Sequence, residues 1–161
     1  MARLNRGNAV RTLKGMVDDG YGLASANLAP VMVLIESRMG LTRLVAGTLN
    51  VRILEDYIVK ADAVISPAEY PLNKEKGTNE TIKLQRCLVR GRKAAIMRPD
   101  THETHGWGNG VQCLELMAAE KLRDTLGLTN GSVVDVEVEG DDAWWASGSN
   151  PVSHTKPQEK E

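Results

Sequence analysis

The alternation of apolar and polar residues is clearest near the C-terminal end of the chain. Valine occupies positions 134, 136 and 138, and an aspartate or glutamate follows each of them. A side-chain period of two is typical of a strand with one buried face, so residues 134–139 are predicted to form a strand. Two further apolar runs, residues 82–89 and 93–97, flank the segment Arg90-Gly91-Arg92 and predict a β-hairpin.

Three more elements are indicated in the first third of the chain. Residues 13–17 predict a short strand that ends at an Asp-Asp-Gly turn sequence. The apolar stretch between Pro30 and Gly40 favours a helix that these two residues delimit, although its β-branched residues also suit a buried strand. Residues 47–54 predict another strand.

The second half of the chain is less regular. Residues 55–80 show no clear pattern, and residues 100–110 contain three glycines around Trp107, which predicts a loop. From residue 111 to 128 the abundance of Ala, Glu, Leu, Lys and Met favours one long helix. Several short strands with few helices indicate a small β-barrel.

The chain is polar after Gly140. We therefore predict a single domain over residues 1–140 and a disordered tail over residues 141–161, which Trp144 and Trp145 interrupt.

Composition and charge limit the kinds of partner that the protein is expected to bind. A chain of 161 residues fits one domain, and a formal net charge of −1 argues against nucleic acid or an anionic membrane as the partner. Two cysteines are too few for a disulfide framework, and no apolar run is long enough to span a membrane. We expect a cytoplasmic, monomeric protein that acts on small molecules.

Two short motifs could carry chemistry. In Gly47-Thr48-Leu49-Asn50-Val51 the Thr and Asn side chains project from one face of an extended segment. Their neutral oxygens suit Mg²⁺ when phosphates and waters complete the coordination, although such residues at a strand entry are often only structural. The turn Gly20-Tyr21-Gly22 could offer backbone N–H groups to a phosphate, or be an ordinary β-turn.

Three blocks of sequence, in this order, resemble the archaeal-type CTP-dependent riboflavin kinases. They are residues 15–22, residues 47–51 and the segments between residues 98 and 131, and together they cover about residues 13–139. The resemblance implies a mainly β fold, a six-stranded cradle-loop barrel with one or two short helices. It also divides residues 111–128 into a strand near 111–117 and a helix near 119–126.

The activity that the resemblance implies is transfer of the terminal phosphate of CTP to riboflavin, which gives FMN and CDP with Mg²⁺. Thr48 and Asn50 would then hold the metal, while Thr101 and Glu115 would bind the flavin, with Thr104 as the rival of Thr101. The nucleotide would contact Tyr21, Gly22, Leu23, Ala24, Ser25 and Ala26 in the glycine turn and Glu120, Lys121, Leu122 and Arg123 further on. No side chain is predicted to be catalytic, because phosphoryl transfer depends mainly on positioning and charge neutralisation.

Some features keep other functions open. The family has a glycine where Ala24 stands and an acidic residue near Leu23, so the chain could instead be a non-catalytic barrel that binds a flavin or nucleotide as a sensor or carrier. A nucleic-acid-binding barrel is disfavoured by the near-neutral charge. His102 and His105 are spaced like metal ligands, but without a Cys-x-x-Cys partner a zinc site is not expected.

Overall fold

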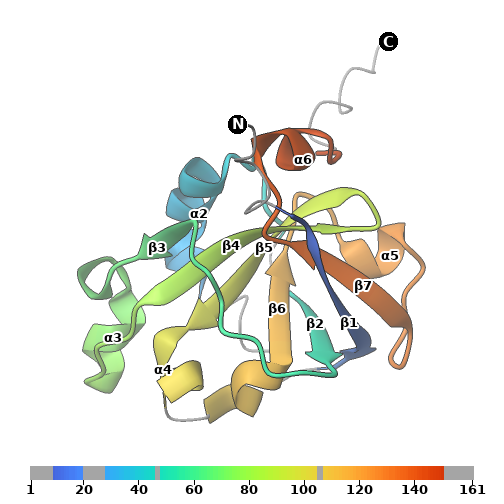
Figure 1. Cartoon of the computed structure of the whole chain (residues 1–161). Coiled ribbons are helices and arrows are strands. Elements are labelled where there is room, and N and C mark those ends of the chain that lie inside the picture. Colours follow the sequence, from blue (N-terminus) through green and yellow to red (C-terminus); the bar gives the residue numbers. More distant parts are fainter. Residues whose placement is uncertain (1–8, 20–27, 46–47, 105–106, 151–161) are drawn as a thin grey trace, which may run out of the picture.

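Strands of one antiparallel sheet make up most of the fold (Figure 1). The structure is a computed structural model, and it describes residues 9–19, 28–45, 48–104 and 107–150. Within these residues the sheet has seven strands in the order β3-β4-β5-β6-β2-β1-β7. The strands are β1 (Arg11–Asp18), β2 (Leu49–Ile53), β3 (Ala63–Ile65), β4 (Ile82–Val89), β5 (Arg92–Pro99), β6 (Cys113–Met117) and β7 (Val133–Val138).

The sheet closes into a barrel because β7 pairs with β1 along one edge and with β4 along the other. Residues 87–89 of β4 pair with β7, whereas residues 82–84 of the same edge pair with the short strand β3. Six strands therefore form a closed barrel and β3 is an addition to its wall. This confirms the predicted six-stranded, mainly β barrel.

Short helices surround the barrel, and in the described part of the chain they are more numerous than the sequence predicts (Figure 1). The α-helices are α2 (Met32–Met39), α3 (Pro71–Lys76), α4 (Asp100–Thr104), α5 (Leu122–Thr125) and α6 (Asp142–Ala146), and the 3-10 helices are η2 (Ala29–Val31), η3 (Pro67–Glu69) and η4 (Trp107–Gln112). None of the helices in the described residues is long and apolar enough to cross a membrane.

The barrel has two apolar clusters, one inside it and one against its outer wall. Leu13, Val51 and Leu114 are among the completely buried side chains of the inner cluster. The outer cluster packs α2, through Ile35 and Met39, against outward-facing residues of β4, β5 and β6. Most of the remaining outer surface of β1 and β2 carries polar side chains, and this is where the candidate site lies.

Turn chemistry explains why several predicted elements are confirmed. Arg90 and Gly91 both have positive φ, 50° and 79°, as a two-residue hairpin turn between β4 and β5 requires. Gly40 has φ 66° and ends α2, which settles the choice between helix and strand for that apolar stretch. The strands predicted at residues 13–17, 47–54 and 134–139 are also present.

The structure differs from two predictions, those for residues 100–110 and 111–128, and it shows regular elements in residues 55–80, where the sequence gave no pattern. Residues 100–110 do not form one loop, because α4 and most of η4 lie there. The single helix that composition favoured for residues 111–128 is replaced by β6 and α5, as the family resemblance implied. Leu114 and Leu116 of β6 point into the barrel, and on the outer face Cys113 and Met117 are also buried, so Glu115 is the strand's single polar residue and no regular polar face marks it. Residues 55–80 contain β3, η3 and α3.

The first part of the predicted tail has a defined conformation. In α6 the indole nitrogen of Trp144 donates to Glu137 of β7 at 3.0 Å. The ring of Trp145 contacts two cations, the guanidinium of Arg86 and the ammonium of Lys93. Residues 151–161 lie outside the described residues, and the division of the chain at residue 140 stays a prediction.

Candidate functional site

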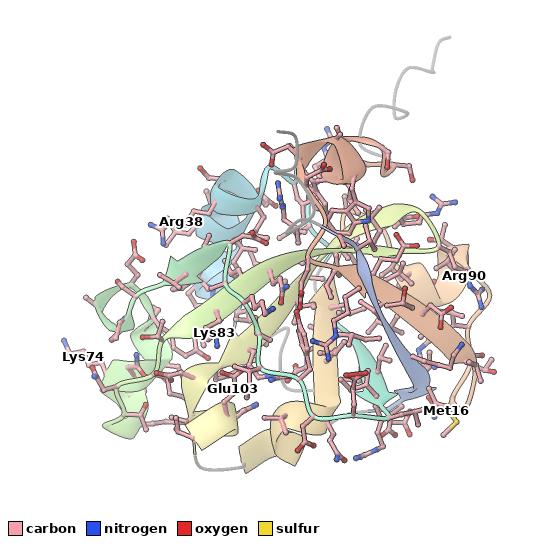
Figure 2. All side chains as sticks on the ribbon, viewed as in Figure 1. Met16, Arg38, Lys74, Lys83, Arg90 and Glu103 are labelled. Carbon is pink, nitrogen blue, oxygen red and sulfur yellow. The ribbon has the colours of Figure 1, made fainter. Side chains whose placement is uncertain are left out.

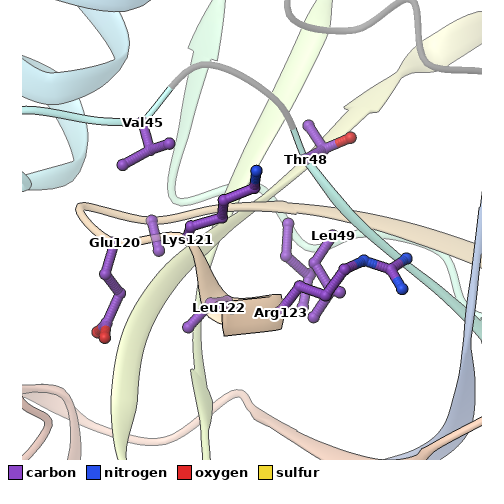
Figure 3. Close-up of a pocket in the computed structure, with 9 residues that line it drawn as sticks. Val45, Thr48, Leu49, Glu120, Lys121, Leu122 and Arg123 are labelled. Carbon is purple, nitrogen blue, oxygen red and sulfur yellow. The ribbon is translucent and has the colours of Figure 1, made fainter. Parts of the chain in front are cut away.

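A pocket of about 80 Å³ lies where the start of β2, the end of β6 and helix α5 meet (Figure 3). It brings Thr48, predicted from one block of sequence, together with the 120–123 segment, predicted from another. The lining residues are Val45, Thr48, Leu49, Leu116, Ala118, Glu120, Lys121, Leu122 and Arg123. A pocket of this size can hold one phosphate group or part of a larger ligand.

The local structure of α5 explains how its cations reach the pocket. Leu122 is buried against the barrel core and anchors this single helical turn, while the residues on either side of it project outward. Figure 3 shows the ammonium of Lys121 directed toward Thr48. Arg123 extends along the opposite side of the pocket, and its guanidinium makes one long contact, 3.4 Å, with the carbonyl oxygen of Asp18.

These two cations have no carboxylate partner within ion-pair distance among the described residues. Glu120 differs from Lys121 and Arg123, because one of its carboxylate oxygens accepts a hydrogen bond from Arg92 at 2.9 Å. The other oxygen is buried and has no partner in the part of the chain that the structure describes. Two unpaired cations beside a hydroxyl group suit a phosphate, to which an arginine can donate two parallel hydrogen bonds.

Asn50 lies in the middle of a row of side chains on the outer wall of the barrel. The strand register pairs it directly with Asp18 of β1 on one side and with Glu115 of β6 on the other. Directly paired residues in antiparallel strands place their side chains on the same face, about 5 Å apart. The row continues from Glu115 to Met97 of β5.

The residues around Asn50 fit a magnesium ion. Asn50 is mostly buried, and its amide nitrogen makes a long hydrogen bond, 3.4 Å, to the carbonyl oxygen of Asp19. Its amide oxygen has no partner within the described ranges and is available as a ligand, with Thr48 two residues before it and the carboxylate of Asp18 beside it. Neutral oxygens and one or two carboxylates suit Mg²⁺ when substrate phosphates complete the shell. Among the described residues, no group of three or more His, Cys, Asp or Glu side chains could hold a metal by itself.

Glu115 is partly buried, and this burial raises the pKa of its carboxyl group, while the positive charge of Arg98 acts in the opposite direction. Tyr70 lies near it: burial, together with the nearby carboxylates of Glu80 and Glu115, raises the pKa of its hydroxyl to about 12. Thr101 joins the same group of residues, because its hydroxyl donates to the carboxylate of Glu80. The charges of Glu80, which Thr101 contacts, and of Glu115 therefore both act on the Tyr70 hydroxyl.

The rival threonine has a different environment. Thr104 is exposed at the end of α4, and its hydroxyl donates to the carbonyl oxygen of Asp100 at 3.3 Å, a bond internal to the helix. This favours Thr101 as the flavin contact, although the assignment stays a prediction. His102 is partly buried, which lowers the pKa of its imidazole, and His105 lies outside the described residues.

The nucleotide-binding residues predicted in the glycine turn also lie outside the described residues. They are Tyr21, Gly22, Leu23, Ala24, Ser25 and Ala26.

Sequence reasoning missed Tyr70, Glu80 and Arg98. Tyr70 and Glu80 fall in a segment with no readable pattern, so no local signal marks them. Arg98 had a signal in the sequence, because it is a charged residue directly after the apolar run 94–97. In the structure it is almost completely buried, which is rare for arginine.

Fold and site together define a class of protein: a small closed β-barrel with a phosphate-suited pocket beside a row of oxygen-bearing side chains. A model named CTP-dep_RFKase, described as a domain of unknown function, DUF120, matches residues 17–138. The chain belongs to this family.

Two curated relatives agree with this assignment, and both are named riboflavin kinase. The protein from Methanocella arvoryzae is 34% identical over 96 residues, which are 58% of this chain and 40% of the relative. The protein from Pyrobaculum arsenaticum is 33% identical over 125 residues, which are 74% of this chain and 55% of the relative. The chain spans about half the length of these relatives.

Proposed function

We propose that this protein is a riboflavin kinase that transfers the terminal phosphate of CTP to riboflavin and releases FMN and CDP. The observation that carries the proposal is the direct pairing of Asn50 with Glu115 across β2 and β6. It places a predicted metal ligand beside a predicted flavin ligand, and Thr48 connects both to the cationic pocket. Membership of a family named for this activity supports the same assignment.

Each group of side chains has a distinct part in the proposed reaction. Lys121 and Arg123 bind the phosphates of the nucleotide, and Thr48 and Asn50 supply oxygens to Mg²⁺. When bound, Mg²⁺ neutralises phosphate charge during transfer. Glu115 accepts a hydrogen bond from riboflavin and holds it next to Asn50. The residues of the glycine turn, 21–26, would complete the nucleotide site.

Positioning is the main contribution of this site. A phosphoryl group in transfer needs its acceptor in line and its charge balanced, and little covalent chemistry is required of the protein. The arrangement of the row Asp18–Asn50–Glu115 beside the pocket would bring the hydroxyl of riboflavin and the phosphate of CTP to neighbouring strands. We assign no side chain as a catalytic base.

The direct test is to incubate the purified chain with riboflavin and Mg²⁺ and with CTP, UTP, ATP or GTP in turn, and to follow FMN by chromatography. CTP should support more FMN formation than ATP. Equal turnover with ATP and CTP would contradict the assignment of the donor. Riboflavin binding with no product from any triphosphate would favour the non-catalytic binding protein instead.

A further inference from the structure

One arginine inside the barrel connects three separate segments of the chain. Arg98, at the end of β5, has only 1% of its surface exposed. Its guanidinium donates to the carbonyl oxygen of Tyr57 at 2.7 Å and to the carbonyl oxygen of Cys113 at 3.1 Å. It also donates to the carboxylate of Glu103 in α4 at 2.9 Å. Planar guanidinium groups can make such divergent bonds at fixed angles, which a lysine cannot.

Glu103 is as fully engaged as Arg98. Its carboxylate accepts from the backbone N–H of Val59 at 2.7 Å and from the ammonium of Lys83 at 2.6 Å. Figure 2 shows Lys83 and Glu103 next to each other. Burial raises the pKa of the Glu103 carboxyl, but Lys83, the Val59 amide and Arg98 together lower it below its ordinary value. Glu103 is therefore held as an anion that pairs with the buried cation.

The positions of these bonds matter for the proposed flavin site. Glu103 is two residues after Thr101 in α4, and Cys113 is two residues before Glu115 in β6. Arg98 thus ties the helix that carries one predicted flavin ligand to the strand that carries the other. It touches neither Thr101 nor Glu115 by a hydrogen bond, so its effect on them passes through the backbone and through its charge.

We propose that Arg98 is a positioning residue for riboflavin: through Glu103 and the Cys113 carbonyl it fixes the distance between Thr101 and Glu115. This inference rests on the proposed function. Ligand contacts hold their geometry only when the groups behind them are locked, and a buried arginine that donates to Tyr57, Glu103 and Cys113 provides such a lock. The nucleotide pocket lies at the other end of β6 and does not share these bonds.

The test separates flavin binding from nucleotide binding in Arg98→Lys. Riboflavin affinity is measured by quenching of flavin fluorescence, the KM for CTP by FMN formation, and Tm by thermal unfolding. Riboflavin affinity should fall about ten- to a hundredfold, the range found for outer-shell partners of metal ligands. The KM for CTP at saturating riboflavin should stay within about twofold of the wild-type value, because positioning errors affect only the ligand concerned.

Arg38→Lys is the matched control. Arg38 of α2 also donates to a carbonyl oxygen, that of Val64, and to a carboxylate, that of Glu69, but it lies away from Glu103 and Lys83 (Figure 2). Its replacement should leave riboflavin affinity unchanged. A second variant, Glu103→Gln, tests the same connection if Arg98→Lys does not fold, and it should likewise weaken riboflavin and spare CTP.

Three results would overturn the inference. One is a lower Tm of a folded Arg98→Lys protein with unchanged riboflavin affinity, which would make Arg98 a purely structural residue. Another is an equal loss of riboflavin and CTP binding, and the third is no change in riboflavin affinity in Glu103→Gln. Failure of the proposed function would look different, because the wild-type chain itself would then form no FMN from any triphosphate.

Discussion

The charged groups near the two ends of β6 differ in whether they are paired within the protein. At its carboxyl end, Lys121 and Arg123 stand beside the pocket with no ion pair among the described residues. At its amino end, Arg98, Glu103 and Lys83 are joined by ion pairs and hydrogen bonds of 2.6 to 3.1 Å. Glu115 lies between the two regions, in the middle of the strand.

The difference shows how to separate a binding group from a structural one. A buried charge must be paired, because desolvation without a partner costs several kcal/mol, so the network around Arg98 is what the fold itself requires. A cation at the surface needs no partner within the protein and remains available for an anionic ligand. Removing the charge of Lys121 or Arg123 should therefore weaken nucleotide binding. Removing a charge from the bonds around Arg98 should instead lower stability or change the local geometry.

The largest effect is expected from the proposed metal ligands. The double variant Thr48→Ala, Asn50→Ala should lose turnover on the order of a thousandfold, the equivalent of several kcal/mol of charge stabilisation. Riboflavin binding should remain, because in the proposed site these side chains would contact metal and phosphate and not the flavin. The assay is FMN formation over a series of Mg²⁺ concentrations.

Thr78→Ala with Asn79→Ala is a matched control for that variant, since this exposed pair follows α3 and lies outside the proposed site. It should retain full activity. Wild-type kinetics of the Thr48, Asn50 double variant at limiting Mg²⁺ would remove both residues from the metal site.

A smaller effect is expected from the unpaired cations. Lys121→Gln and Arg123→Gln should each raise the KM for CTP about ten- to a hundredfold, because hydrogen bonds to charged groups contribute about 1.5–3 kcal/mol. Tm should not change, since neither cation has an ion pair in the described structure. Lys74→Gln in α3 serves as the control. A drop in Tm with an unchanged KM for CTP would instead assign Lys121 and Arg123 a structural role like that of Arg98.

Glu115→Gln examines the middle of the strand. Riboflavin affinity should fall by roughly ten- to a hundredfold, because the amide is a weaker acceptor than the carboxylate. Fluorescence titration measures this, with Thr101→Val and Thr104→Val tested alongside to decide which threonine belongs to the site. Glu75→Gln, on the exposed side of α3, is the control.

The opposite result for Glu115→Gln is equally informative. Weaker CTP binding with unchanged riboflavin affinity would mean that the two ligands are exchanged in our proposal. Loss of folding would assign Glu115 to the structural group.

The smallest effect concerns alkaline pH. Burial raises the pKa of Tyr70 to about 12. It also raises the pKa of Tyr57, whose hydroxyl donates to Glu139 and whose carbonyl oxygen accepts from Arg98. Because the pKa of Tyr70 is higher in the folded state, its contribution to the free energy of unfolding is complete below pH 10, the pKa of an unfolded tyrosine. This contribution is lost as the pH rises from 10 toward 12. Tyr70→Phe should reduce this loss.

Phenolate absorbance during a pH titration measures the ionisation, and urea unfolding at each pH measures the stability. Ordinary titration of both tyrosines near pH 10 would show that this side of the barrel is open to water.

Local signals in the sequence were sufficient for elements with a clear period or a clear turn. The valine alternation in β7, the Arg90-Gly91 turn and the helix between Pro30 and Gly40 each depend on contacts within a few residues, so they could be predicted. The strand β6 could not be predicted from composition, because its faces are buried by distant parts of the chain: Leu114 and Leu116 in the inner cluster and Met117 in the outer cluster. The family resemblance supplied it instead.

The sequence by itself determined which residue types were available for the site: the Thr48 and Asn50 oxygens, the cations of α5 and the carboxylate of Glu115. Only the tertiary structure decided which of them are neighbours. Asn50 and Glu115 are 65 positions apart in the chain, and antiparallel pairing of β2 with β6 places them opposite each other. The network of Arg98 likewise exists only in the fold, since a buried arginine is stable where distant carbonyl and carboxylate groups converge on it.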